Sequence, residues 1–107
     1  MSEYSWPQVD AGWGEVVRAA WPVTVEALPI GARVTGEVVG RQRFGVFLRF
    51  DEVPDAVGLA EILTMPRDVV LPQVGTRFAG EVIWHAEHNH QVKVRITGWP
   101  IEADPVE

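Results

Sequence analysis

The sequence predicts an all-β protein, a small five-stranded barrel with a short helical extension at its N-terminus. The chain has 107 residues, which suffice for one domain with one hydrophobic core. After residue 32, five short apolar segments are typical of strands, and four of them alternate apolar and polar residues with a period of two. Gly36, Gly45 and Gly80 lie inside these segments, where they mark sharp bends or close backbone approaches. Strands that bend in this way favour a closed barrel.

Residues 1–27 are expected to form an N-terminal extension that is partly helical. Residues 1–9 are polar and aromatic, and we expect them to be extended. Asp10 is a candidate N-cap for a helix that Pro22 is expected to end. Residues 23–26 are interpreted as a short strand or a connector. The apolar face of the helix recurs at helical spacing and consists of Trp13, Val16, Val17, Ala20 and Trp21.

Residues 28–98 are expected to form the barrel domain, and residues 99–107 an acidic tail. The segments predicted to be strands are 33–38, 45–50, 57–59, 77–84 and 92–96. A turn at 40–43 joins the first two strands into a hairpin, and residues 61–63 are predicted to form one helical turn. The fourth and fifth strands are expected to be joined by a polar loop at 85–91.

The net charge of −6 comes from the flanks of the chain rather than from its middle. Residues 31–98 carry eight basic and eight acidic side chains, so local patches decide what this region attracts. The absence of cysteine excludes disulfides, thiolate nucleophiles and cysteine zinc sites. No apolar run is long enough to span a membrane, and residues 1–10 lack a signal-peptide pattern. We therefore expect a cytoplasmic protein, and its preference for arginine over lysine hints at a bacterial genome rich in GC.

Five short segments in order resemble the S-one motif, an RNA-binding repeat named after the largest protein of the bacterial small ribosomal subunit. They are LPIGARVTGEV at 28–38, FGVFL at 44–48, GLAEI at 58–62, VGTRFAGEV at 74–82 and VKVRIT at 92–97. The resemblance covers about residues 28–97. It implies an OB-fold, a five-stranded Greek-key barrel that binds oligonucleotides across one face.

In that family two aromatic residues of the Phe-Gly-x-Phe segment stack on bases, and here they correspond to Phe44 and Phe47. Phe47 shares a strand face with Arg49, opposite the apolar residues of the same strand, so an outward ring beside a cation is expected. Phe44 has the other parity, and we expect it to be exposed because it lies at the start of the strand. This interpretation requires Phe47 to be open to solvent.

The resemblance also implies that a basic side chain of the last strand contacts the RNA backbone, and Lys93 occupies the matching position. By their places in the sequence, further candidates for backbone contact are Arg95 on the same strand face, Arg49 beside Phe47, and Arg41 and Arg43 in the first turn. If three or four phosphates are contacted, affinity should fall with salt with a logarithmic slope of about −2 to −3. The chain departs from the family at two positions. Glu61 stands where the family usually has His, and Asn89 or Glu87 falls where it has Asp.

Each of these features also has a purely structural interpretation. Phe47 could be covered by the N-terminal helix, and the basic residues could pair with Glu37, Glu61 or Glu81. Trp6, Trp13 and Trp21 are expected to seal the barrel or a partner interface. We interpret the histidines of one loop, namely His85, His88 and His90, as a solvated hairpin tip rather than a metal site.

The preferred prediction is a small stand-alone protein that binds single-stranded RNA, as an accessory to a ribosome or an RNA-processing complex. It requires no cofactor and no metal, and no catalytic motif indicates an enzyme. The alternative is a protein-interaction module or homodimer that uses the barrel and the tryptophan-rich, acidic N-terminal segment without binding RNA.

Overall fold

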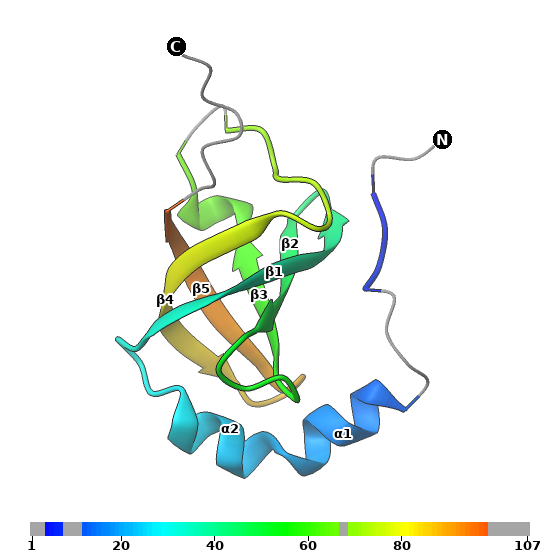
Figure 1. Cartoon of the computed structure of the whole chain (residues 1–107), viewed down its shortest axis with the longest axis vertical. Helices are drawn as coiled ribbons and strands as arrows, with labels where there is room; N and C mark the ends of the chain where they lie inside the picture. Colours follow the sequence, from blue (N-terminus) through cyan, green and yellow to red (C-terminus); the bar gives the residue numbers. More distant parts are fainter. Residues whose placement is uncertain (1–3, 8–11, 67–68, 99–107) are drawn as a thin grey trace.

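The computed structural model describes residues 4–7, 12–66 and 69–98, and its strands form one closed barrel in the order β1-β2-β3-β5-β4 (Figure 1). The predicted five-stranded all-β barrel is confirmed, and every strand except β2 is longer than predicted. The strands are β1 (Arg33–Gln42), β2 (Gly45–Phe50), β3 (Val57–Glu61), β4 (Arg77–Ala86) and β5 (Gln91–Gly98).

Strand β1 lies between two neighbours and pairs in antiparallel fashion with both β2 and β4. β2 pairs antiparallel with β3, and β4 pairs antiparallel with β5. The barrel is closed by β3 and β5, which run parallel between residues 57–59 and 91–93. A parallel pair needs a long connection. Here that connection contains a 3-10 turn, η1 (Ile62–Thr64), close to the predicted helical turn, and then β4.

The barrel interior is filled by the alternating apolar residues of the strands. Each fully buried Val, Leu or Phe side chain contributes about 1.5–3 kcal/mol relative to an exposed one, which makes this core the main source of stability. The interior residues are Val34, Val38, Val46, Leu48, Phe50, Phe78, Val82, Val92 and Val94.

Gly36 confirms the expectation that glycines mark close approaches. It pairs with Phe50 of β2 on one side and with Phe78 of β4 on the other. A Cβ atom at this position would collide with the carbonyl oxygen of Arg49 and would lie 2.9 Å from Cε1 of Phe78. A side chain of any kind therefore cannot be placed here without separating β1 from β2.

Two helices, α1 (Trp13–Ala19) and α2 (Trp21–Ala27), replace the single predicted helix. They lie beneath one end of the barrel (Figure 1). The prediction that Pro22 ends the helix is wrong, as is the strand or connector at 23–26. Pro22 lies in the first turn of α2, where its missing N–H costs no hydrogen bond. Gly12 is the N-cap of α1, and the proposed cap Asp10 lies outside the described residues.

Helix α2 seals its end of the barrel through Trp21, which is buried and belongs to the core. The indole Nε1 donates a hydrogen bond to Oε1 of Glu87 at 2.9 Å. The rings of His85 and His90 pack against Trp21 edge-on at 6.2 and 5.4 Å. The interpretation of these two histidines as a solvated tip is therefore wrong, because they hold a core tryptophan in place.

Among the described residues, no helix has the length and hydropathy to cross a membrane. The predicted acidic tail at 99–107 lies outside the described residues.

Candidate nucleic-acid interface

Three aromatic rings meet on the outer wall of the barrel, where β1, β2 and the N-terminal segment come together. Phe44 lies in the β1–β2 turn, and Phe47 lies on β2. Their ring centroids are 5.9 Å apart in an edge-to-face arrangement. Trp6 lies 5.7 Å from Phe47 and 6.3 Å from Phe44, tilted by 47° to each. We call Trp6, Phe44 and Phe47 the aromatic cluster.

The described N-terminal segment, residues 4–7, lies along the barrel and brings Trp6 to this wall (Figure 1). Ser5 and Arg41 form a β-bridge, in which each backbone N–H donates to the other residue's carbonyl oxygen at 2.7 Å. The two backbone hydrogen bonds of this isolated bridge thus hold the segment beside the end of β1. Such bonds do not depend on the side chain of Trp6.

The predicted exposure of Phe47 is wrong. Its side chain retains only 6% of its accessible surface, although it lies outside the core cluster, as its parity on β2 predicts. The ring that packs on Phe47 from the N-terminal part of the chain is Trp6, which lies before the helices. The exposed rings of the cluster are instead Trp6 at 61% and Phe44 at 44%. The wall therefore remains aromatic on its surface, but through different residues.

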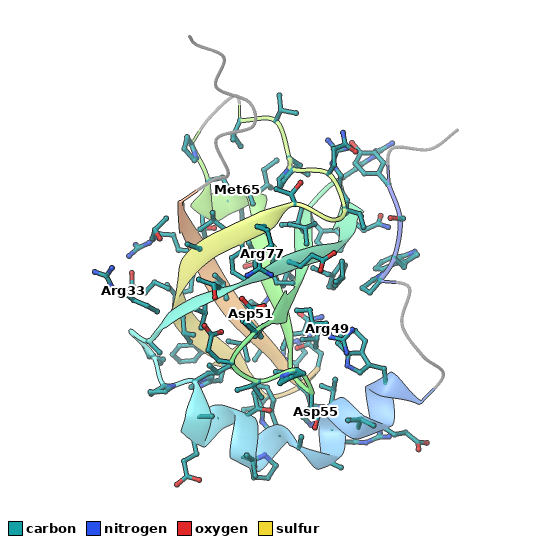
Figure 2. All side chains as sticks on the ribbon, in the orientation of Figure 1. Arg33, Arg49, Asp51, Asp55, Met65 and Arg77 are labelled. Atoms are coloured by element: carbon teal, nitrogen blue, oxygen red, sulfur yellow. The ribbon has the colours of Figure 1, made fainter. Side chains whose placement is uncertain are left out.

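Two of the predicted basic residues lie open beside the aromatic cluster. Arg43 is exposed in the same turn as Phe44. Arg49 is exposed on β2 two residues after Phe47, with its guanidinium 6.0 Å from the centre of the Trp13 ring. Neither has an ion-pair partner among the residues that the structure describes. Figure 2 shows Arg49 on the side of the barrel nearest α1, with Arg33 at the opposite edge.

The sequence predicts Arg41 in an open turn, and this prediction is wrong. β1 continues to Gln42, and Arg41 keeps only 5% of its accessible surface. Its Nη2 donates to the carbonyl oxygen of Leu71 at 3.0 Å, and its guanidinium lies 5.7 Å from the centre of the Tyr4 ring. The geometry gives Arg41 a role in anchoring the N-terminal segment rather than in meeting a phosphate.

Lys93 and Arg95 are both engaged with carboxylates. Nζ of Lys93 donates to Oε2 of Glu61 at 3.1 Å, and the lysine side chain is only 17% exposed. Nη2 of Arg95 donates to Oε1 of Glu81 at 2.6 Å. The alternative interpretation, in which these two basic residues pair with glutamates, is therefore confirmed. A carboxylate offsets each charge, which weakens the attraction of Lys93 and Arg95 for phosphate.

A further ion pair links the β2–β3 loop to β4, away from the aromatic cluster. Asp51 accepts hydrogen bonds from Arg77 and, at 2.8 Å, from Oγ1 of Thr35. Figure 2 labels both members of this pair on the face turned to the viewer. The hydrogen bond from Arg77, followed by that from Thr35, holds the pKa of Asp51 below its ordinary value of 3.8. The carboxylate in turn raises the pKa of Arg77.

The sequence did not predict that Trp6 belongs to this wall. From the sequence, Trp6 is expected to seal the barrel or a partner interface, and in the structure it packs on Phe47. The available signal was the pair Trp6-Pro7 in an extended polar segment, which does not reveal its partner strand. Within the described part of the chain, no cluster of three or more side chains is suited to hold a metal ion.

No protein-family model matches the chain, and no curated protein matches it significantly. Solved structures do resemble it. RNase R of Mycoplasma genitalium, in complex with ribose-methylated single-stranded RNA, gives a TM-score of 0.64 at 16% identity, over 76% of this chain and 15% of that one. A chain of the a/eIF2alpha–aDim2p–rRNA complex from Pyrococcus horikoshii gives a TM-score of 0.55 at 19% identity, over 63% of this chain and 43% of that one. GSP13 of Bacillus subtilis gives a TM-score of 0.55 at 22% identity, over 75% of this chain and 74% of that one.

The barrel has an OB-fold. The five-strand order and the similarity to these structures support this assignment, as the sequence motifs predicted. The chain spans 15% of RNase R and 43% of the Pyrococcus chain. The similarity therefore concerns one OB-fold barrel, and the activities of the larger proteins do not follow from it.

Proposed function

We propose that this protein binds single-stranded RNA on the wall formed by β1, β2 and β3, with little preference for sequence. The observation that carries the proposal is the exposed surface of the aromatic cluster, with Arg43 and Arg49 beside it. Every base has a π-face that an aromatic ring can stack on, and such stacking contributes about 1–3 kcal/mol per base. Arginines next to such rings offer bidentate contacts to phosphate.

The resemblance to other S-one-type folds supports the proposal from a second direction. The Mycoplasma RNase R structure contains single-stranded RNA, and the Pyrococcus structure contains rRNA. In OB-folds, oligonucleotides bind across the face of the barrel that carries strands β2 and β3. We place the RNA on the corresponding wall here. A cytoplasmic setting and an accessory role in a ribosome or an RNA-processing complex belong to the same proposal.

The test is a titration of fluorescein-labelled oligo-U and oligo-dT, followed by anisotropy at low and at physiological salt. Micromolar binding of oligo-U at low salt is the expected result, and Phe44→Ala and Arg43→Gln are expected to weaken it. Arg33→Gln, which removes an exposed arginine at the opposite edge of the barrel, is the matched control. Absence of binding at low salt contradicts the proposal.

A second candidate function, contact with another protein or with a second copy, is favoured by one specific observation. Trp84 and Ile30 are 61% and 56% exposed and line a shallow pocket together with His85 and Glu87. Exposed large apolar residues of this kind are common at interfaces. The mass in solution tests this candidate. A dimer that dissociates on Trp84→Ala supports it, and one that dissociates on Trp13→Ala instead assigns the interface to the N-terminal helices.

A further inference from the structure

We infer that the N-terminal segment is an integral part of the RNA-binding wall and that Trp6 is its principal base-stacking residue. Phe47, the ring expected from the sequence, is then a positioning residue beneath Trp6. The inference rests on the proposed function, because it names the ring on which a base of the RNA stacks. The alternative is that the segment is a lid that RNA must displace.

The surface of the barrel is shaped to hold the N-terminal segment. Besides the backbone bridge between Ser5 and Arg41, Pro7 lies directly against Gly40 of β1. A Cβ atom at Gly40 would lie 2.8 Å from Cδ of Pro7 and 2.9 Å from its backbone nitrogen. Gly40 also lies at the irregularity in the β1–β2 register, opposite Phe47. The missing side chain at Gly40 therefore lets the segment lie close to the ring that Trp6 covers.

The indole of Trp6 remains exposed although it packs on two other rings. Trp6 packs on Phe47 and Phe44 and still leaves 61% of its surface accessible. A lid that sealed the wall would be expected to bury its own aromatic surface. Here the cover presents a larger ring than the phenyl ring it hides. Two ring contacts restrain the indole, so little conformational entropy is lost when a base stacks on it.

Basic side chains lie close to the N-terminal segment and the aromatic cluster. Tyr4 packs on Arg41 at one end of the segment, which anchors it. Arg43 is exposed in the turn beside Phe44, and Arg49 is exposed on the strand face that carries Phe47. A base on Trp6 therefore has exposed guanidinium groups nearby for its phosphates. Stacking and phosphate contact are the two elements that sequence-tolerant single-strand binding needs.

The experiment compares two tryptophans of equal exposure on different parts of the barrel. Trp6 and Trp84 are each 61% exposed, so Trp84→Ala is the matched control for Trp6→Ala. With oligo-U at low salt, Trp6→Ala is expected to weaken binding about 5- to 150-fold, the range for loss of one stacked base. Trp84→Ala is expected to leave affinity unchanged, and Trp6→Phe to retain most of it.

A second variant displaces the segment without altering any of its residues. Gly40→Val places a side chain where Pro7 lies, so it is expected to dislodge Trp6 and weaken oligo-U binding in the same direction as Trp6→Ala. Thermal unfolding followed by circular dichroism identifies any variant that has lost the barrel. Deletion of residues 1–7 gives the same comparison in a chain whose strands are unchanged.

The role of Phe47 is tested by coupling. Phe47→Leu keeps an apolar side chain under Trp6 but removes the ring face. It is expected to weaken binding in the wild-type chain and to have no further effect in the Trp6→Ala chain. A merely structural role would give the same loss in both backgrounds. In protein labelled with 5-fluorotryptophan, the resonance absent from Trp6→Phe is the one expected to shift when oligo-U is added.

The outcomes separate the two proposals. Tighter binding by Trp6→Ala, Gly40→Val or the deletion identifies the segment as a lid and overturns the inference while RNA binding stands. Unchanged binding by Trp6→Ala also overturns it. Absence of oligo-U binding by the wild-type protein at low salt overturns both proposals, and this result is visible before any variant is made.

Discussion

Lys93 on β5 donates a hydrogen bond to Glu61 on β3 at 3.1 Å, and this pair neutralises the basic residue that the S-one motif places in its last strand. Glu61 occupies the position where the family usually has His. The substitution puts a carboxylate on the wall proposed to meet RNA, and that carboxylate repels phosphate as well as engaging Lys93. The wall is therefore expected to bind RNA more weakly than the motif alone implies.

Removing this carboxylate should strengthen RNA binding. Glu61→Gln keeps the size of the side chain, frees Lys93 and removes one repulsive charge. We expect the affinity for oligo-U to rise about threefold or more at low salt, with a salt slope steeper by about 0.7 because one more phosphate is neutralised. The measurement is anisotropy over a series of salt concentrations. Glu81→Gln, which breaks the Arg95 pair instead, is the control, and equal gains in both variants would rule out a local effect.

The salt dependence of the wild-type protein should be shallow. Lys93 and Arg95 are paired with carboxylates and Arg41 is buried, so within the predicted set only Arg43 and Arg49 are both exposed and without an ion-pair partner among the described residues. Two phosphate contacts give a slope of about −1.4 on a single strand. Arg49→Gln is expected to reduce it to about −0.7, whereas Arg33→Gln leaves it unchanged. A slope of about −3 in the wild-type protein would show that Lys93 and Arg95 neutralise phosphates as well when RNA binds.

The barrel could be predicted from the sequence because its signals are local. Alternation along β1, β2, β4 and β5 gives strand positions, and it also gives the correct outward direction of Phe47. The glycines indicated the close approaches, as at Gly36. Helix α2 was missed because Pro22 is compatible both with the end of one helix and with the first turn of the next.

The candidate site was predicted less well because it depends on contacts between distant parts of the chain. Nothing near residue 47 indicates that Trp6 covers it, and a short extended segment has no periodicity that reveals its partner strand. Whether the ammonium group of Lys93 contacts solvent, a phosphate or a carboxylate likewise depends on where Glu61 lies after folding. The alternation along a strand predicts whether a side chain points into the barrel or outward, but not which other residues lie beside it.

Two glycine substitutions should change stability in opposite directions. Gly36→Ala introduces a Cβ that collides with the backbone of Arg49, so we expect it to destabilise the protein by about 3 kcal/mol, the upper range for overpacking. Gly14 lies in α1, and a Cβ atom added there would meet nothing within 4 Å, so Gly14→Ala should stabilise by up to about 1 kcal/mol. Urea unfolding measures both. A neutral Gly36→Ala would contradict the packing of β1 against β2.

The Asp51–Arg77 pair predicts a pH-dependent contribution to stability. The pKa of Asp51 is lowered by its hydrogen bonds from Arg77 and Thr35, whereas in the unfolded chain it titrates near 3.8. A group with a lowered pKa in the folded state stabilises the protein above its unfolded pKa, and this contribution is lost as pH falls through the folded pKa. Asp51→Asn is therefore expected to be slightly less stable than wild type at neutral pH, and the difference should disappear in acid below 3.8.

Urea unfolding of Asp51→Asn and wild type across this pH range measures the effect, which is expected to be small because both side chains are largely exposed. Asp55→Asn is the matched control, because Asp55 lies in the same loop and has no ion pair among the described residues. Arg77→Gln should reproduce the loss at neutral pH, and combining it with Asp51→Asn should add little further. A difference between Asp51→Asn and wild type that persists unchanged into acid would mean that the ionised carboxylate is not its source.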